Sequence, residues 1–205
     1  MLKYDGNVIQ FLGRMGDLLW LNVLTLVCSL GIVTAGPAFA ALHYVLYQIG
    51  QGNESGINKS FFKALCENFR QASVLGLLCI CLITFMVIDL QFIFQSGCSV
   101  VVSALLICIM VLAIMYITWI FPVQSHYIGK IGHTLRNAFF FMLSYPIQSF
   151  AMAVFYVVPL VAIVFPAVLP ISLLLGFSLP AWLSMIIYRT SFRKIDTKEE
   201  KKNSN

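Results

Sequence analysis

Three long stretches of this chain carry no charged side chain, and they constrain its fold more than any other feature. They cover residues 18–53, 90–129 and 137–188. A helix of about 20 apolar residues is enough to cross a lipid bilayer, and each stretch exceeds that length. The chain is 60% hydrophobic and 10% charged, whereas soluble domains average about 25% charged residues. This composition excludes a soluble globular domain and predicts an all-α, polytopic transmembrane helical bundle.

Proline, glycine and charged positions divide these stretches into about six predicted crossings, arranged as three hairpins. The first turn is expected at Gly36 and Pro37, because proline cannot donate to the preceding helical turn and disfavours helix at the residue before it. Two further turns are expected at 95–99 and 166–170. An alternative is one kinked helix over residues 18–51, which leaves five crossings. The six predicted crossings are residues 18–35, 37–51, 73–94, 100–122, 147–165 and 168–188.

The basic residues support this threading. All 13 Lys and Arg side chains lie before the first, between the second and third, between the fourth and fifth, or after the sixth predicted crossing. Positively charged residues accumulate in cytoplasmic segments during membrane insertion, so both termini are expected in the cytoplasm. The same rule accounts for the formal net charge of +5. No basic surface interleaved with aromatic side chains points to nucleic acid, and none is expected as a partner.

The bundle covers residues 18–188. The segments that join its crossings on the cytoplasmic side, and the two ends of the chain, are predicted to lie at or outside the membrane surface. Residues 58–72 and 127–141 have apolar side chains at helical spacing and are predicted to be amphipathic elbow helices. Residues 1–17 form a weaker amphipathic helix, and residues 189–205 a charged, disordered cytoplasmic tail. The elbows either dock a partner or only brace the bundle at the headgroups. Their candidate docking or interface residues are Phe61, Phe62, Lys63, Phe69, Arg70, Lys130 and Arg136.

Tryptophan and tyrosine side chains gather towards the cytoplasmic ends of the predicted crossings. Such amphipathic rings are typical of the headgroup level, so they are interpreted as membrane anchors. The predicted anchors are Trp20, Trp119, Trp182, Tyr127, Tyr145 and Tyr188.

Asp89 is the only carboxylate or amine inside a predicted crossing. A charge there costs at least ~2.5 kcal/mol unless it is paired, neutralised or hydrated. Asp89 and His43 each lie roughly 9 Å below the outer surface, counted from their turns at ~1.5 Å per residue, so the two can meet. They form either a proton-linked or ligand-binding pair, or a hydrated carboxylate beside a packed histidine. Asn22 is a further polar candidate in the first crossing.

Common catalytic and metal-binding patterns are missing from the sequence. It contains no HExxH, GxSxG, Walker loop, GxGxxG or paired carboxylates. Cys79 and Cys81 are two apart on a predicted helix and point to different faces, so they cannot chelate one metal together. No catalytic residue, metal site or cofactor is therefore predicted.

The first hairpin and the first elbow contain a set of short motifs. These are Gly16-Asp17-Leu18, Leu21-Asn22, Cys28-Ser29-Leu30, Thr34-Ala35-Gly36-Pro37-Ala38, and Phe61-Phe62 through Asn68-Phe69-Arg70-Gln71. With them, the chain resembles the YesL-type family of uncharacterised bacterial membrane proteins. The resemblance is good over residues 7–75 and general afterwards, and Gly31 departs from it where members often have proline. It implies a cytoplasmic-membrane protein, often encoded near carbohydrate-uptake and carbohydrate-degradation genes, without an established activity.

Three functions are compatible with these features. The favoured one is a non-enzymatic accessory or assembly partner that contacts the bilayer and a carbohydrate transporter subunit. The second is a small-solute transporter or permease with a polar site around Asp89, His43 and Asn22. The third is an intramembrane enzyme of unfamiliar type. A water-accessible cavity lined by these polar residues favours transport, whereas a solidly packed bundle favours the accessory role.

Overall fold

The computed structural model describes residues 5–52, 56–95, 99–127, 129–162 and 176–203 of the chain. Its regular elements are all helices, and no strand occurs within these ranges, which confirms the predicted all-α class. In chain order the helices are α1 (Asp5–Ser29), α2 (Ile32–Gly50), α3 (Ile57–Glu67), α4 (Phe69–Gln95), α5 (Val100–His126), α6 (Ile131–Ser144), α7 (Pro146–Ala162) and α9 (Ser178–Asn203).

Three of these helices, α2, α4 and α5, are long and apolar enough to cross a membrane. Helices α6 and α7 pass the same test only when taken together, and they are bent by 107° at the break between them. The described part of the chain therefore provides three or four candidate spans, where the sequence predicted six crossings. The predicted turn at 166–170 and the adjoining ends of the last two crossings lie outside the described residues.

The turn of the first hairpin lies at Leu30 and Gly31, so the prediction of a turn at Gly36 and Pro37 is wrong. Gly31 is extended (φ −86°, ψ 130°) at the N-cap of α2, and its carbonyl accepts a hydrogen bond of 2.9 Å from Thr34 Oγ1. Pro37 lies in the second turn of α2, where it removes only one backbone hydrogen bond and is itself buried. Because α1 and α2 pack against each other, the alternative of one kinked helix is also wrong.

Helices α1 and α9 are longer than the sequence predicted. α1 passes from residue 17 to residue 18 without a break, so the N-terminal amphipathic segment and the first crossing are one helix. α9 continues to Asn203, so the segment predicted as a disordered tail is helical up to that residue. The first part of α9 is held by buried side chains such as Tyr188 and Phe192. Once a helix is nucleated in this way, Lys and Glu extend it at little cost.

Both segments predicted as elbows are helical, with shifted bounds. α3 ends at Glu67, because Asn68 leaves the helical conformation (φ −110°, ψ 14°) before α4 begins. The second elbow, α6, begins at Ile131 because Tyr127 is extended (φ −103°, ψ 119°). Asn68 therefore separates α3 from α4, and Tyr145 (φ −130°, ψ 61°) separates α6 from α7 at the 107° bend.

Helix α2 is the centre of the packed core and contacts α1, α3, α4, α5 and α9. Its closest approach is to α4. A Cβ atom added to Gly36 would lie 2.1 Å from the carbonyl oxygen of Ala72, and one added to Gly76 would lie 2.6 Å from the Cα of Gly36. Small residues allow helix backbones to touch in this way in membrane proteins. Gly36 therefore serves helix packing and not a turn.

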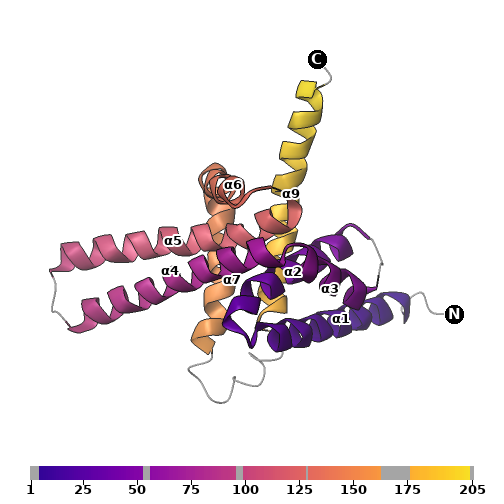
Figure 1. The fold of residues 1–205 in the computed structure, drawn as a ribbon, viewed down its shortest axis with the longest axis horizontal. Coiled ribbons are helices and arrows are strands. Elements are labelled where there is room, and N and C mark those ends of the chain that lie inside the picture. Colours follow the sequence, from indigo (N-terminus) through magenta and orange to yellow (C-terminus); the bar gives the residue numbers. More distant parts are fainter. Residues whose placement is uncertain (1–4, 53–55, 96–98, 128, 163–175, 204–205) are drawn as a thin grey trace.

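Helices α4 and α5 form a long hairpin that projects away from the other helices, while α7 and α9 run across its direction (Figure 1). Only the beginning of α4 and the end of α5 enter the packed core. The outer part of the hairpin exposes large apolar side chains, including Phe85 at 61%, Phe94 at 80% and Val100 at 85%. An apolar surface of this extent marks a contact with lipid or with another protein.

Candidate functional site

His43 of α2 is buried in the core and joins two other helices. Its Nε2 lies 3.0 Å from Tyr156 Oη on α7, and its Nδ1 lies 3.4 Å from Tyr188 Oη on α9. A neutral imidazole has one donor and one acceptor nitrogen, so one tyrosine donates to the ring and the other accepts from it. Both ring nitrogens therefore serve to hold α2, α7 and α9 together.

Tyr188 also belongs to a buried aromatic cluster, in which the His126 ring stacks on Phe192 with centroids 4.5 Å apart. Trp119 stacks on Phe141 at 5.1 Å, and its Nε1 donates to Ser149 Oγ at 2.7 Å. These contacts draw α2, α5, α6, α7 and α9 together at one place. We define the aromatic cluster as Tyr47, Trp119, His126, Tyr127, Phe141, Tyr188 and Phe192.

The aromatic cluster corrects two of the predicted membrane anchors. Trp119 and Tyr188 are fully buried inside the protein and do not face headgroups. The reason is the crossed arrangement of α5 and α9, which turns their aromatic faces towards each other. Trp20 is different, because it is about half exposed and its Nε1 donates to Asn58 Oδ1 at 2.6 Å.

Asn22 of α1 is fully buried and caps a helix distant in sequence. Its Oδ1 accepts hydrogen bonds of 3.1 Å from the backbone amides of Phe177 and Ser178, at the start of α9. The first amides of a helix have no partner within the helix, and such groups are usually satisfied by a side-chain oxygen. Here that oxygen comes from another helix, so Asn22 couples the position of α1 to that of α9.

Replacing this acceptor gives a test of the cap. We expect Asn22→Leu to lower the free energy of unfolding by about 1–3 kcal/mol, because two buried amides lose their acceptor. Thr25→Val is the matched control, since Thr25 is also fully buried on α1 but its hydroxyl donates to the Leu21 carbonyl of the same helix. Thermal unfolding of the detergent-solubilised protein compares the two variants. Equal losses in both would show that the Oδ1 contacts do not stabilise the fold.

Asp89 lies apart from both of these residues. It is half-buried on the outer part of α4, and no hydrogen bond or ion pair of its carboxylate is found within the described ranges. The expected meeting of Asp89 and His43 is not found, because both His43 nitrogens face tyrosines. The positions on α9 that His43 and Asn22 contact are themselves about 15 Å apart along the helix. The three polar candidates therefore do not form one site.

A second polar junction, not predicted from the sequence, joins the start of α4 to the end of α5 and the start of α6. Gln71 Nε2 lies 2.6 Å from the Gly129 carbonyl oxygen, 3.1 Å from Gln124 Oε1 and 3.4 Å from Thr134 Oγ1. Thr134 Oγ1 in turn donates to Gln124 Oε1 at 3.1 Å. This junction sets the connection of α3 to α4 against the connection of α5 to α6. Its only sign in the sequence is a pair of amide residues, Gln71 at the start of α4 and Gln124 near the end of α5.

The predicted docking residues are exposed, with one exception. Phe61 is buried in the core, because α3 turns that face towards α2. Phe62 and Phe69 are exposed, as are Arg70, Lys130 and Arg136. The exposed Lys63 makes an ion pair with Glu67, with 3.9 Å between Nζ and Oε1. Gln71 follows Arg70 and Gly129 precedes Lys130, so both cations lie beside the Gln71 junction.

No group of three His, Cys, Asp or Glu side chains in the described part of the chain is placed to hold a metal ion. The side chains of His43, Asn22 and Gln71 instead bond partners on other helices, and these bonds join helices from both halves of the chain. These hydrogen bonds fix the angles at which the helices cross and the positions of their ends. These features define the class of the molecule as an all-helical membrane protein whose apolar helices contact lipid.

Comparisons with known proteins agree with this class. A family described as "Protein of unknown function, DUF624" matches residues 18–90. The chain is also 31% identical over 191 residues to the uncharacterized protein YesL of Bacillus subtilis (strain 168), and the match covers 90% of this chain and 88% of YesL. The chain therefore belongs to the YesL family, as the motifs of its first hairpin indicated. No solved structure matches it.

Proposed function

We propose that this protein is a non-enzymatic accessory or assembly partner of a carbohydrate-uptake system. In this proposal it crosses a bacterial cytoplasmic membrane several times, with both termini in the cytoplasm. The observation that carries the proposal is that His43 and Asn22, the polar residues inside α2 and α1, are buried and bonded within the protein. The link to carbohydrate uptake comes from the family resemblance.

Two other functions have less support from the geometry. A transporter or permease needs polar atoms that face a substrate near the middle of the membrane. The candidates Asp89, His43 and Asn22 lie apart, and the nitrogens of His43 face tyrosines. An intramembrane enzyme needs reacting groups in one place, whereas Asp89 lies apart from His43 and Asn22, and these two are bonded as helix contacts.

The projecting hairpin of α4 and α5 is the surface that an assembly partner would use. Its outer part projects from the other helices (Figure 1) and carries exposed apolar side chains, and the half-buried Asp89 lies within it. A carboxylate at membrane depth costs at least ~2.5 kcal/mol unless it is paired, neutralised or hydrated. A helix of the transporter with a hydrogen-bond donor facing Asp89 would remove that cost. The exposed elbow residues, such as Phe62 and Lys130, supply a second contact at the membrane surface.

Photo-crosslinking in native membranes tests this proposal. A photoreactive residue is placed at Phe85 or Ile88 on the hairpin, at Phe62 on α3, and at Leu75, which is buried on α4, as the control. We expect the two hairpin positions to capture a membrane subunit of a carbohydrate transporter and the Leu75 position to capture none. The crosslinked product is identified by mass spectrometry. Capture of lipid alone from both hairpin positions and from Phe62 would overturn the accessory role.

A further inference from the structure

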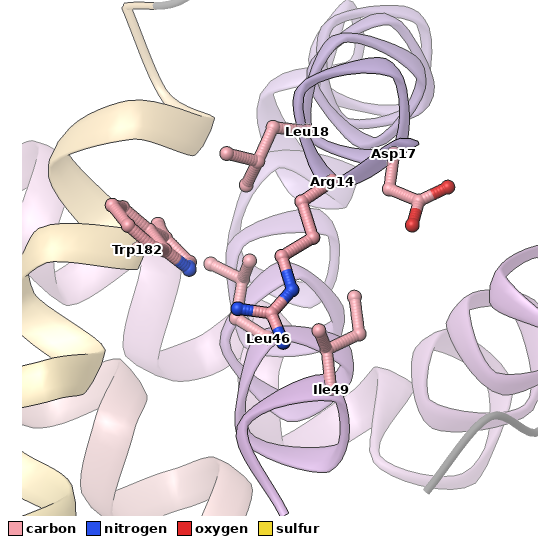
Figure 2. A pocket seen from close by; sticks show the side chains of 6 residues that line it. All are labelled: Arg14, Asp17, Leu18, Leu46, Ile49 and Trp182. Atoms are coloured by element: carbon pink, nitrogen blue, oxygen red, sulfur yellow. The ribbon is translucent and has the colours of Figure 1, made fainter. Parts of the chain in front are cut away.

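A small pocket lies between α1, α2 and α9 (Figure 2). Its apolar part is formed by buried Leu18 and Leu46, together with the partly exposed Ile49. The side chains that line the pocket are Arg14, Asp17, Leu18, Leu46, Ile49 and Trp182. It therefore combines an apolar floor with charged and amphipathic groups at its edge.

The polar groups of this pocket are arranged asymmetrically. In Figure 2 the Arg14 side chain extends from α1 towards Leu46 and Ile49, and its guanidinium faces the side where Trp182 stands. The Asp17 carboxylate points away from that guanidinium. Among the described residues, neither Arg14 nor the Trp182 indole has a hydrogen-bond or ion-pair partner. Two sets of N–H donors therefore meet beside an apolar floor with no acceptor in the described part of the chain.

A second arginine adds positive charge at the same end of α2. Arg189 Nη1 lies 3.8 Å from the position that a Cβ on Gly50 would take, and Gly50 directly follows Ile49 of the pocket. Arg189 is exposed and, in the described ranges, forms no ion pair. With Arg14, Asp17 and Arg189 together, the charge around this end of the pocket is positive. The ligand that such a surface attracts is an anion.

We propose that the mouth of this pocket binds a phosphate ester, with the phosphate on Arg14 and the Trp182 N–H and the apolar part of the ligand on the partly exposed Ile49 and the Trp182 ring. A guanidinium presents several N–H donors in a fixed fork that matches phosphate oxygens. An indole ring with one apolar side and one donor is suited to the headgroup level of a bilayer. The ligand class is an anion that carries both a phosphate and a hydrocarbon portion. The headgroup of an acidic phospholipid has this chemistry, and a soluble phosphate compound shares its anionic part.

Fluorescence quenching by brominated lipids tests this assignment. Trp20→Phe serves as the background, so that Trp182 and the fully buried Trp119 are the remaining tryptophans. The protein is placed in phosphatidylcholine nanodiscs that contain bromine-labelled phosphatidylglycerol or, in parallel, bromine-labelled phosphatidylcholine. We expect phosphatidylglycerol to quench Trp182 at a lower content in the bilayer than phosphatidylcholine does. The content should fall about fivefold for each arginine that contributes, since one cation near the surface supplies about that factor.

Three variants make the result specific to the pocket. Arg14→Gln keeps a polar side chain without the charge and should remove most of the preference for phosphatidylglycerol, whereas Arg14→Lys should keep part of it. Arg70→Gln removes an exposed cation outside the pocket and should leave the preference unchanged. Equal quenching by both lipids in the unmodified protein, or equal effects of Arg14→Gln and Arg70→Gln, would overturn the proposal.

Inorganic phosphate distinguishes the two sources of the anion. If the phosphatidylglycerol preference persists when inorganic phosphate is added, the headgroup is the ligand and the hydrocarbon portion contributes to binding. If inorganic phosphate removes the preference in the unmodified protein and Arg14→Gln no longer responds to it, the site accepts phosphate from a soluble source. Absence of any response to either probe overturns the assignment of a phosphate site. These measurements use lipid and phosphate alone, so they are independent of whether the protein assists a carbohydrate transporter.

Discussion

Alanine at Gly76 is expected to lower the free energy of unfolding by about 1–3 kcal/mol, because the added methyl group overpacks the contact between α4 and α2. Its Cβ would lie 2.6 Å from the Cα of Gly36 and 2.9 Å from the Gly36 nitrogen. These are backbone atoms, which cannot turn aside as a flexible side chain can. Gly36→Ala meets the carbonyl oxygen of Ala72 at 2.1 Å and should be at least as damaging. Thermal unfolding of the detergent-solubilised protein measures both effects.

Gly16→Ala is the control for these two variants. Gly16 is exposed within α1, and no atom lies within 4 Å of the position its Cβ would take. Because alanine is the better helix former, this variant should gain up to about 1 kcal/mol. The change from glycine to alanine is thus expected to raise the free energy of unfolding at Gly16 and to lower it at Gly36 and Gly76. If all three variants unfolded at the same temperature, the close contact of α2 with α4 would be refuted.

His43→Leu is the second variant with a large expected effect. It removes the partner of both Tyr156 Oη and Tyr188 Oη within the core. Each hydroxyl left without a partner in the core costs about 1–3 kcal/mol, so the two together should cost roughly 2–6 kcal/mol. Equilibrium unfolding in mixed micelles, followed by circular dichroism, measures this difference.

A variant with all three polar groups removed separates hydrogen bonding from packing. In His43→Leu/Tyr156→Phe/Tyr188→Phe no partner is left unsatisfied, and replacing both sides of a buried hydrogen bond by apolar groups can be nearly neutral. We therefore expect the triple variant to be more stable than His43→Leu alone. If it is less stable, the contribution of His43 comes from its shape and not from its nitrogens.

The early part of the chain shows how far sequence reasoning extends. The uncharged stretches identified a helical membrane protein, and the motifs of the first hairpin identified the YesL family. The elbows were found from helical spacing, because an amphipathic helix carries its pattern within one turn or two. The turn at Gly36 and Pro37 was misplaced, since a glycine needed for a helix crossing and a glycine needed for a turn look alike in sequence. Only the neighbouring helix, with Ala72 and Gly76, distinguishes the two uses.

The polar candidates show what the sequence does not reveal, which is the partner of each side chain. Asp89, His43 and Asn22 stand out in the sequence as polar side chains within apolar segments, but the partners of His43 and Asn22 cannot be read from it. His43 bonds Tyr188, and Asn22 bonds the amide of Ser178, both on a helix far along the chain. Trp119 was taken for a membrane anchor because an aromatic ring near a helix end suits either a headgroup or a buried cluster. Burial against Phe141 and Phe192 decides for the cluster.

By itself, the sequence determined the properties that depend on neighbouring residues: helical structure, the preference of the long helices for lipid, and family membership. These follow from local hydrophobicity and spacing, which act over a few turns of one helix. The tertiary structure alone decided which faces meet, that α4 and α5 project as a hairpin, and that Arg14 and Trp182 share a pocket. Those outcomes depend on how helices cross, and a crossing is set by the combined shape of side chains from segments that are distant in the chain.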